Sequence, residues 1–263
     1  MPVKISIITV CYNNKNGLEK TIHSVKDQTY KGFEFIIVDG VSTDGTLDLI
    51  EKNKQYISTL ISEKDNGIYQ AMNKGISLAK GEYCLFLNSG DCLANNKVLE
   101  NIFNPSNEAD IIYGNVIKVK PHYRRLIKYS SVLSLYDFYR TTAAIHHQAS
   151  FIKRVLFQKY GLYREDLKIN GDWEFFFRMI ILEQSKTKYV DMVISVVDGT
   201  GISNNMKKDN PLRLIASKDK ENILKSNFPV YILFDYQKLD KILSHTSFWQ
   251  RIVNKINYFK FKK

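Results

Sequence analysis

The chain has 263 residues, and its hydrophobic fraction of 44% and charged fraction of 25% are ordinary for a globular protein. The net charge of +11 favours anionic partners, but no nucleic-acid-binding module signature is present, so nucleic acid is the least favoured of them. No apolar run approaches the length needed to span a bilayer, and the N-terminus lacks a signal-peptide layout. Cys11, Cys84 and Cys92 lack metal-site spacing, so we expect a cytoplasmic protein with reduced cysteines.

Strand and helix signals alternate along the first third of the chain. Apolar, β-branched runs predict buried strands at residues 5–12, 33–38, 57–61 and 83–87. Helical spacing of apolar residues predicts helices between these strands, at residues 18–25, 46–53 and 68–79. This alternation favours an α/β domain with parallel strands and right-handed crossovers.

The remainder of the chain gives more widely spaced signals. Strands are predicted at residues 110–119 and 189–197, and helices at residues 133–139, 154–160, 172–182 and 211–227. No stretch has the composition of an interdomain linker, so we expect one domain followed by a C-terminal tail.

Asp39 is expected at the carboxyl end of the second strand, where ligands bind in open α/β sheets. Its carboxylate would accept hydrogen bonds there from a base N–H or a ribose hydroxyl. Ser42, Thr43 and Asp44 follow, and all three are good helix N-cap types. The alternative is therefore that this stretch only turns the chain and caps a helix.

Polar residues also follow two other strands of the predicted sheet, at residues 9–13 and 88–91. Because the carboxyl ends of parallel strands meet at one edge of a sheet, three βα units direct polar groups into one crevice. Such convergence is more specific than any of the three motifs alone.

Five stretches carry a resemblance to a known family, and they lie at residues 5–13, 38–46, 63–75, 81–91 and 171–174. Over roughly residues 3–200 the chain resembles a family 2 glycosyltransferase with the GT-A fold, nearest to bacterial members that build capsule, colanic-acid-like or O-antigen glycans. The resemblance implies a Rossmann-like, mostly parallel central sheet flanked by helices. It implies a GT-A domain at 1–205, with a nucleotide-binding half at about 1–95 and an acceptor half at about 96–205, then a helical extension at 206–263.

The resemblance also implies an inverting transfer from a nucleotide-sugar, usually a UDP-sugar, to a glycan or lipid-linked acceptor in bacterial surface polysaccharide synthesis. In the family, the residue matching Asp39 contacts the uracil base. The residues matching Thr9 and Tyr12 line the nucleotide pocket, and the residue matching Asp65 lies by the nucleoside.

Residues 88–91 match the family's acidic metal motif, commonly Asp-Ala-Asp-Asp, but read Asn-Ser-Gly-Asp and keep one carboxylate. Mn²⁺ and Mg²⁺ prefer oxygen ligands, so Asp91 is the expected metal ligand and Asn88 a weaker candidate. The alternative for Asp91 is a turn or helix-cap carboxylate. The depleted motif also supports a rival interpretation, a nucleotide-sugar-binding regulator that has lost catalysis.

Asp172 is the expected general base, because it opens a helix in a stretch that resembles the family's Glu-Asp motif. Inverting transfer needs a base for the acceptor hydroxyl proton, and a helix N-terminus keeps a carboxylate ionised. The alternative is that Asp172 only caps the helix. Glu174 is a second candidate base or acceptor contact, and His146 and His147 are candidate contacts of the acceptor, the diphosphate or the metal.

Residues 248–263 place apolar side chains on one helical face beside several Lys and Arg residues. This pattern is typical of a helix on an anionic inner-leaflet surface, and equally of a helix packed on the body or on a second subunit in a homodimer.

Two other enzyme classes use related sheets, the sugar-nucleotide pyrophosphorylases and the dinucleotide dehydrogenases. Both need a glycine-rich phosphate loop directly after a strand, and residues 11–14 (Cys-Tyr-Asn-Asn) do not provide one.

Overall fold

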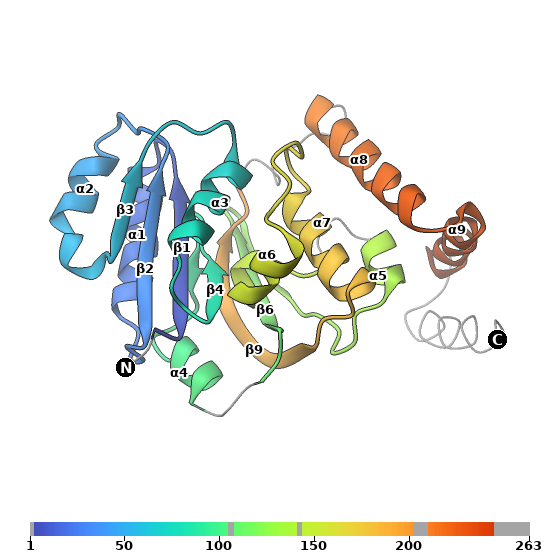
Figure 1. The fold of residues 1–263 in the computed structure, drawn as a ribbon, viewed down its shortest axis with the longest axis horizontal. Helices are drawn as coiled ribbons and strands as arrows, with labels where there is room; N and C mark the ends of the chain where they lie inside the picture. The colour runs from blue at the N-terminus through green and yellow to red at the C-terminus, as the bar shows by residue number, and fades with distance from the viewer. Residues whose placement is uncertain (1–2, 105–107, 141–143, 202–209, 245–263) are drawn as a thin grey trace.

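The computed structural model describes residues 3–104, 108–140, 144–201 and 210–244. Within these residues, nine strands form one central sheet, and helices lie on both of its faces (Figure 1). No helix in the described ranges is long and apolar enough to cross a membrane. The amphipathic segment predicted at residues 248–263 lies outside the described residues.

The first part of the chain forms the regular α/β alternation that its hydrophobic pattern predicts. Its strands are β1 (Ile5–Cys11), β2 (Phe33–Asp39), β3 (Thr59–Ser62) and β4 (Tyr83–Phe86). Its helices are α1 (Lys15–Lys26), α2 (Thr46–Lys52), the short 3₁₀ helix η1 (Lys54–Tyr56) and α3 (Ile68–Leu78). The four strands and three longer helices expected from the sequence are confirmed, although β3 begins two residues later than predicted because η1 precedes it.

The second part is less regular. Its strands are β5 (Cys92–Leu93), β6 (Ile111–Lys120), β7 (Tyr123–Ile127), β8 (Ser150–Lys153) and β9 (Thr187–Asp198). Its helices are α4 (Val98–Phe103), α5 (Leu135–Arg140), η2 (His147–Ala149), α6 (Arg154–Tyr160), α7 (Gly171–Phe177), η3 (Arg178–Leu182), α8 (Pro211–Asn227) and α9 (Val230–Ser244). The helix expected at 172–182 begins at Gly171 and becomes π-helical from Arg178, and the short elements β5, α4 and β7 were not predicted.

The sheet runs in the order β3-β2-β1-β4-β8-β6-β9-β5, with β7 paired to β6. Strands β1 to β4 are parallel, and β6 and β9 are also parallel, whereas β8, β5 and β7 join antiparallel. Cys11 pairs with Asp39, and Asp39 pairs with Ser62, so β1, β2 and β3 end at one level. This register collects the residues that follow these strands at one edge of the sheet.

Two apolar clusters fill the two faces of the sheet. Alternate residues of β1 enter different clusters, with Ile8 in the one that contains α3, α6 and α7 and Ile7 in the one that contains α1 and α4. Helix α7 packs into the cluster that contains α3 and α6 through its aromatic rings, and the Phe175 ring stacks on the Phe157 ring at 4.4 Å between centroids. Strands buried on both faces are typical of parallel sheets covered by helices.

Gly171 lets the first turn of α7 approach α3. A Cβ atom built on Gly171 would lie 2.8 Å from the ring of Tyr69, closer than real side chains allow. The Tyr69 ring is buried and contacts the ring of Tyr163 at 5.7 Å between centroids, so it has little room to move. The position of α7, and with it Asp172, therefore depends on the absence of a side chain at residue 171.

Replacing Gly171 with Ala should lower the free energy of unfolding by about 1–2 kcal/mol, measured by urea denaturation, because the added methyl overpacks the contact with Tyr69. Gly201→Ala is the matched control, since no heavy atom of the residues that the structure describes lies closer than 3.9 Å to its added Cβ. Equal unfolding free energies for Gly171→Ala and the wild type would contradict this account of how α7 is seated.

Candidate active site

Asp39 ends β2 and is fully buried. Its carboxylate accepts hydrogen bonds from Ser42 N at 3.0 Å and from Ser62 Oγ at 2.7 Å, and the Ser42 and Cys11 side chains also donate to it. These contacts fasten the turn after β2 to the neighbouring strands β1 and β3. Asp39 therefore forms the turn that the sequence analysis left open as an alternative, and it has no surface exposed to a ligand.

Asp44 stabilises the first turns of two helices. Its carboxylate accepts from Thr46 N at 3.1 Å and from Lys15 N at 3.0 Å, which are backbone donors at the starts of α2 and α1. The N-cap residue of α2 is Gly45, with φ 86°, and it makes no side-chain cap hydrogen bond. The first backbone donor of α2, the N–H of Thr46, is therefore satisfied by Asp44 rather than by an N-cap side chain.

Tyr12 and Asp65 flank the backbone of Gly40. A Cβ atom built on Gly40 would lie 3.1 Å from Asp65 Oδ2 and 3.2 Å from Tyr12 Cδ2. Tyr12 is 66% exposed, whereas Thr9 is fully buried, and its Oγ1 has no hydrogen-bond partner among the described residues. The structure thus brings Tyr12, Asp65 and the turn after Asp39 to one edge and leaves Thr9 inside the sheet.

Asp91 follows β4 and is 4% exposed. Its Oδ2 accepts from Gln148 Nε2 at 3.0 Å, and its Oδ1 accepts from the backbone N–H of Asp198 at 2.9 Å. Burial raises the pKa of Asp91 to about 6, although the two hydrogen bonds oppose that rise. Asp91 is thus held between η2 and the end of β9.

Asp198 is a carboxylate at this site that the sequence analysis missed. A Cβ atom built on Gly90 would lie 3.5 Å from Asp198 Oδ2, so the Asp198 side chain lies against the motif position that has no side chain of its own. Thr200 N, at 2.8 Å, and Thr200 Oγ1, at 2.6 Å, hold the other oxygen of Asp198. An acidic residue at the end of a predicted strand before Gly-Thr-Gly was the available sequence signal.

Two amide oxygens near Asp91 are buried without partners. Asn88 Oδ1 and Gln148 Oε1 accept no hydrogen bond from the described residues. Unsatisfied buried acceptors call for an explanation, and a cation is one. The described residues contain no group of three or more His, Cys, Asp or Glu side chains that could hold a metal. A donor set of two carboxylates and two amide oxygens nevertheless fits Mg²⁺ or Mn²⁺.

Asp172 lies in the first turn of α7 with a side chain 24% exposed. Its carboxylate accepts from His147 Nδ1 at 2.9 Å and from Trp173 N at 2.9 Å. The Tyr69 hydroxyl, 3.0 Å away, is shared between Asp172 and the closer backbone carbonyl of Ile169. Burial alone would raise the pKa of Asp172, but His147 and the other donors outweigh it and hold the pKa below its usual value. The N-cap residue of α7 is Asn170, so the alternative role of Asp172 as N-cap is wrong.

His147 connects Asp172 with the loop after β4. Its Nε2 lies 3.2 Å from Asn88 Nδ2, and its Nδ1 lies 2.9 Å from Asp172. An –NH₂ group donates, so in this arrangement Nε2 accepts from Asn88 and Nδ1 donates to Asp172. One hydrogen-bonded chain, Asn88–His147–Asp172, therefore runs from the motif at residues 88–91 to the expected base.

Two other predicted residues have different partners. Burial lowers the pKa of His146 to about 4, and its Nδ1 contacts Tyr129 OH. Glu174 is 6% exposed and forms an ion pair with Arg178 at 3.0 Å. Because a helix turns about 100° per residue, Glu174 projects to the opposite side of α7 from Asp172. The structure brings neither side chain into the hydrogen-bonded chain of His147.

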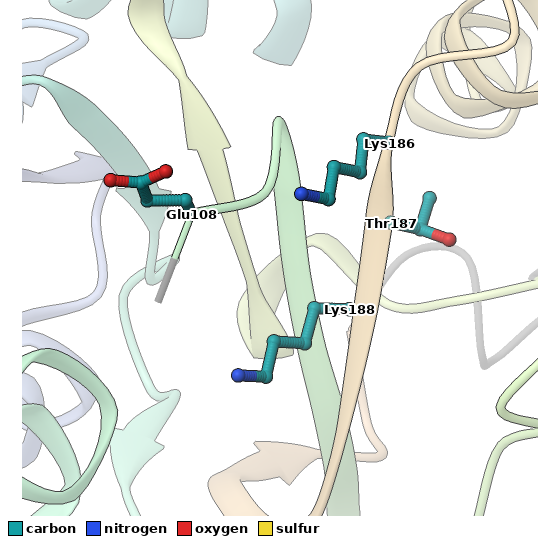
Figure 2. Close-up of a pocket in the computed structure, with 4 residues that line it drawn as sticks. All are labelled: Glu108, Lys186, Thr187 and Lys188. Atoms are coloured by element: carbon teal, nitrogen blue, oxygen red, sulfur yellow. The ribbon is translucent and has the colours of Figure 1, made fainter. Parts of the chain in front are cut away.

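A separate surface hollow lies at the other end of β9. Figure 2 shows Lys186, just before β9, and Lys188 projecting to one side and Thr187 to the other, with Glu108 on the lysine side and its carboxylate pointing away from the lysines. Asp198 lies eleven residues further along β9, which corresponds to about 35 Å of extended strand. This hollow is therefore remote from the residues around Asp91.

Comparison with known proteins places the chain among sugar-transferring enzymes. The family described as Glycosyl transferase family 2 matches residues 6–167. The chain belongs to glycosyl transferase family 2. It is a glycosyltransferase, and its curled, helix-flanked sheet is the GT-A fold.

A PGL/p-HBAD biosynthesis glycosyltransferase of Mycobacterium bovis is 31% identical to this glycosyltransferase over 208 residues, which are 76% of this chain and 79% of the relative. The putative teichuronic acid biosynthesis glycosyltransferase TuaG of Bacillus subtilis is 42% identical over 90 residues, covering 33% of this chain and 36% of the relative. TarS 1–349 of S. aureus, in complex with UDP-GlcNAc, matches 97% of this chain and 79% of its own at 17% identity, with a TM-score of 0.63. Against another structure of this TarS fragment, the glycosyltransferase spans 61% of that chain's length.

The low pKa of Asp172 makes a prediction about acid stability. The native glycosyltransferase holds Asp172 ionised, so the stability that its hydrogen bonds supply is present above about pH 4 and is lost as the pH falls further. The difference in unfolding free energy between the wild type and Asp172→Asn should therefore shrink between pH 7 and pH 3 in urea denaturation. Tyr69→Phe removes one donor and should reduce that shrinkage. A difference that stays constant over this range would contradict the prediction.

Proposed function

We propose that this glycosyltransferase transfers a sugar with inversion from a UDP-sugar to a glycan or lipid-linked acceptor in bacterial surface polysaccharide synthesis. The single observation that carries the proposal is the hydrogen-bonded chain from Asn88 through His147 to Asp172. It joins a partly exposed carboxylate to the loop that would hold the donor diphosphate. The relatives named for PGL/p-HBAD and teichuronic acid biosynthesis support the surface-glycan setting.

For the nucleotide, we propose contacts with Tyr12 and Asp65. Both side chains lie against the backbone of Gly40, so they stand together at the edge where β1 and β2 end. Asp39 and Thr9 are fully buried, so Asp39 would act by shaping the turn that carries Gly40, and Thr9 by packing beneath it. The UDP-GlcNAc bound in the TarS relative supports a uridine nucleotide as the donor.

A divalent cation would be held by Asp91, Asp198 and the amide oxygen of Asn88. When bound, it offsets the negative charge that builds on the departing diphosphate. Asp198 would supply the exposed carboxylate that the motif lacks at Gly90, while Asp91 remains in its buried hydrogen bonds. This second carboxylate weakens the rival interpretation as a non-catalytic regulator, which depends on the depleted motif.

Asp172 would act as the general base. The acceptor hydroxyl oxygen forms its bond to the anomeric carbon, the bond from that carbon to the diphosphate oxygen breaks, and the hydroxyl proton passes to the Asp172 carboxylate. His147, Tyr69 and Trp173 N orient the carboxylate. The same donors lower its basicity, but they keep Asp172 unprotonated and ready at neutral pH.

Asp172→Asn should reduce turnover by about 10²–10⁴-fold, because the amide cannot accept the acceptor proton. UDP release with Mn²⁺ and candidate acceptors measures turnover, and calorimetry with UDP checks that donor binding is retained. Asp166→Asn, at an exposed carboxylate paired with Arg164, is the control. Near-normal turnover of Asp172→Asn would rule out Asp172 as the base.

Asp198→Asn should weaken Mn²⁺ binding in the presence of UDP by at least about tenfold, because an oxygen ligand of the cation loses its charge. Titration calorimetry or Mn²⁺ electron paramagnetic resonance measures this affinity without catalysis. Asp191→Asn is the matched control, since Asp191 is exposed on the same strand and pairs with Lys128. Unchanged Mn²⁺ affinity in Asp198→Asn would exclude Asp198 from the cation site.

A further inference from the structure

The β6–β7 hairpin concentrates positive charge. Between residues 111 and 136 the sequence has five Lys or Arg residues, one His and no Asp or Glu. The basic side chains are Lys118, Lys120, His122, Arg124, Arg125 and Lys128. A stretch of 26 residues thus carries +5 of the chain's net charge of +11.

The strand register places like charges opposite one another. Lys118 lies directly opposite Arg125 across the ladder, and this is the one like-charge pair in the register of β6 with β7. Like charges directly opposite destabilise a strand pair. Burial lowers the pKa of Lys118, and the positive charges of Lys120 and Arg125 lower it further. The cations of the hairpin are therefore close enough to repel one another. Lys128, at the root of the hairpin, pairs with Asp191 at 3.0 Å. The hairpin keeps this charge density despite its unfavourable effect on stability, which indicates a use for it.

The hairpin stands next to the candidate cation site. Gly199 donates its N–H to Val119 O at 2.7 Å, and it directly follows Asp198, whose own N–H binds Asp91. A Cβ atom built on Gly199 would lie 2.7 Å from Lys120 Cγ and 3.3 Å from Lys118 Cε, so these lysine side chains pass over the Gly199 backbone. The basic surface is therefore continuous with the edge of the site that holds Asp198.

The tip of the hairpin also exposes apolar side chains. Tyr123 is 48% exposed and Leu126 is 47% exposed, and the neighbouring Arg124 and Arg125 are exposed as well. Arginine guanidinium groups match phosphate geometry with paired hydrogen bonds. Side chains alternate between the two faces of a strand, so Arg125 lies beside Tyr123 on one face of β7 and Arg124 beside Leu126 on the other. A guanidinium group next to an exposed apolar side chain fits a ligand that joins a phosphate group to an apolar chain.

We propose that the β6–β7 hairpin binds the phosphate or pyrophosphate group of the acceptor and so places the acceptor hydroxyl toward Asp172. This inference rests on the proposed function, because it names the chemistry of the second substrate of the same site. The phosphate belongs to the acceptor rather than the donor, because the donor diphosphate would lie at the cation site on the other side of Gly199.

The test measures the affinity of the full-length glycosyltransferase, saturated with UDP and Mn²⁺, for geranyl pyrophosphate. This probe is a soluble pyrophosphate that carries an apolar hydrocarbon tail. Saturation keeps the probe out of the donor site. The double variant Arg124→Ala/Arg125→Ala should weaken probe binding at least tenfold and leave UDP affinity unchanged. The variant Arg213→Ala/Lys218→Ala removes two exposed cations from α8, matches the change in net charge, and should leave probe binding unchanged.

The outcomes separate the explanations. Equal loss of probe binding in both double variants would reduce the effect to net charge and overturn the proposal. Loss of binding to phosphatidylglycerol vesicles without loss of geranyl pyrophosphate binding would make the hairpin a membrane contact, which also overturns it. Unfolding midpoints in urea check the fold, and the hairpin variant should be no less stable because it removes the opposed charges. Absence of UDP binding to the wild type would instead contradict the proposed function.

Discussion

His147 joins the two parts of this glycosyltransferase, because its ring contacts Asn88 of the first part through Nε2 and Asp172 of the second part through Nδ1. The regular α/β part contributes Asn88 at the end of β4, and the irregular part contributes α7 with Asp172. His147 precedes β8, the strand that pairs antiparallel with β4, so the sheet itself sets its position between them. The close seating of Gly171 on Tyr69 completes this arrangement, because Tyr69 also donates to Asp172. A shift of α7 would disturb both contacts at once.

The four acidic residues of the candidate site differ in how far their side chains are buried. Asp39 and Asp91 are almost without exposed surface and are held by donors of the protein, which ties turns to strand ends; for Asp91 the proposed cation contact would add to these hydrogen bonds. Asp172 and Asp198 retain exposed surface, and each has partners that fix its direction. The roles proposed for Asp172 and Asp198 need both properties, since a buried carboxylate is favoured in its neutral form while a freely rotating one is poorly oriented. The surface charge is also unevenly placed, because the β6–β7 hairpin gathers cations beside this site.

The hydrophobic pattern was enough to predict the α/β alternation of the first part and the bounds of α8, because periodic apolar residues report directly on burial. It missed β5, α4 and β7, which are short or rich in arginine and present no such periodicity. The site was predicted in part. Asp91 and Asp172 were located by motif, and they do lie at one end of the sheet with His147 between the motif loop and α7. Glu174 was grouped with them by sequence proximity, but the turn of the helix directs it to Arg178.

The sequence by itself determined the class of fold, the family and the segments from which the site is built, because these depend on local periodicity and on motifs of adjacent residues. Only the tertiary structure decided which side chains meet. Asp198 lies against Gly90 although more than a hundred residues separate them, and the basic residues of the hairpin reach the same edge through the pairing of β6 with β9. Strand pairing and helix seating create such contacts, and a linear pattern carries no record of them, since each residue's local preference is satisfied equally well with or without its distant partner.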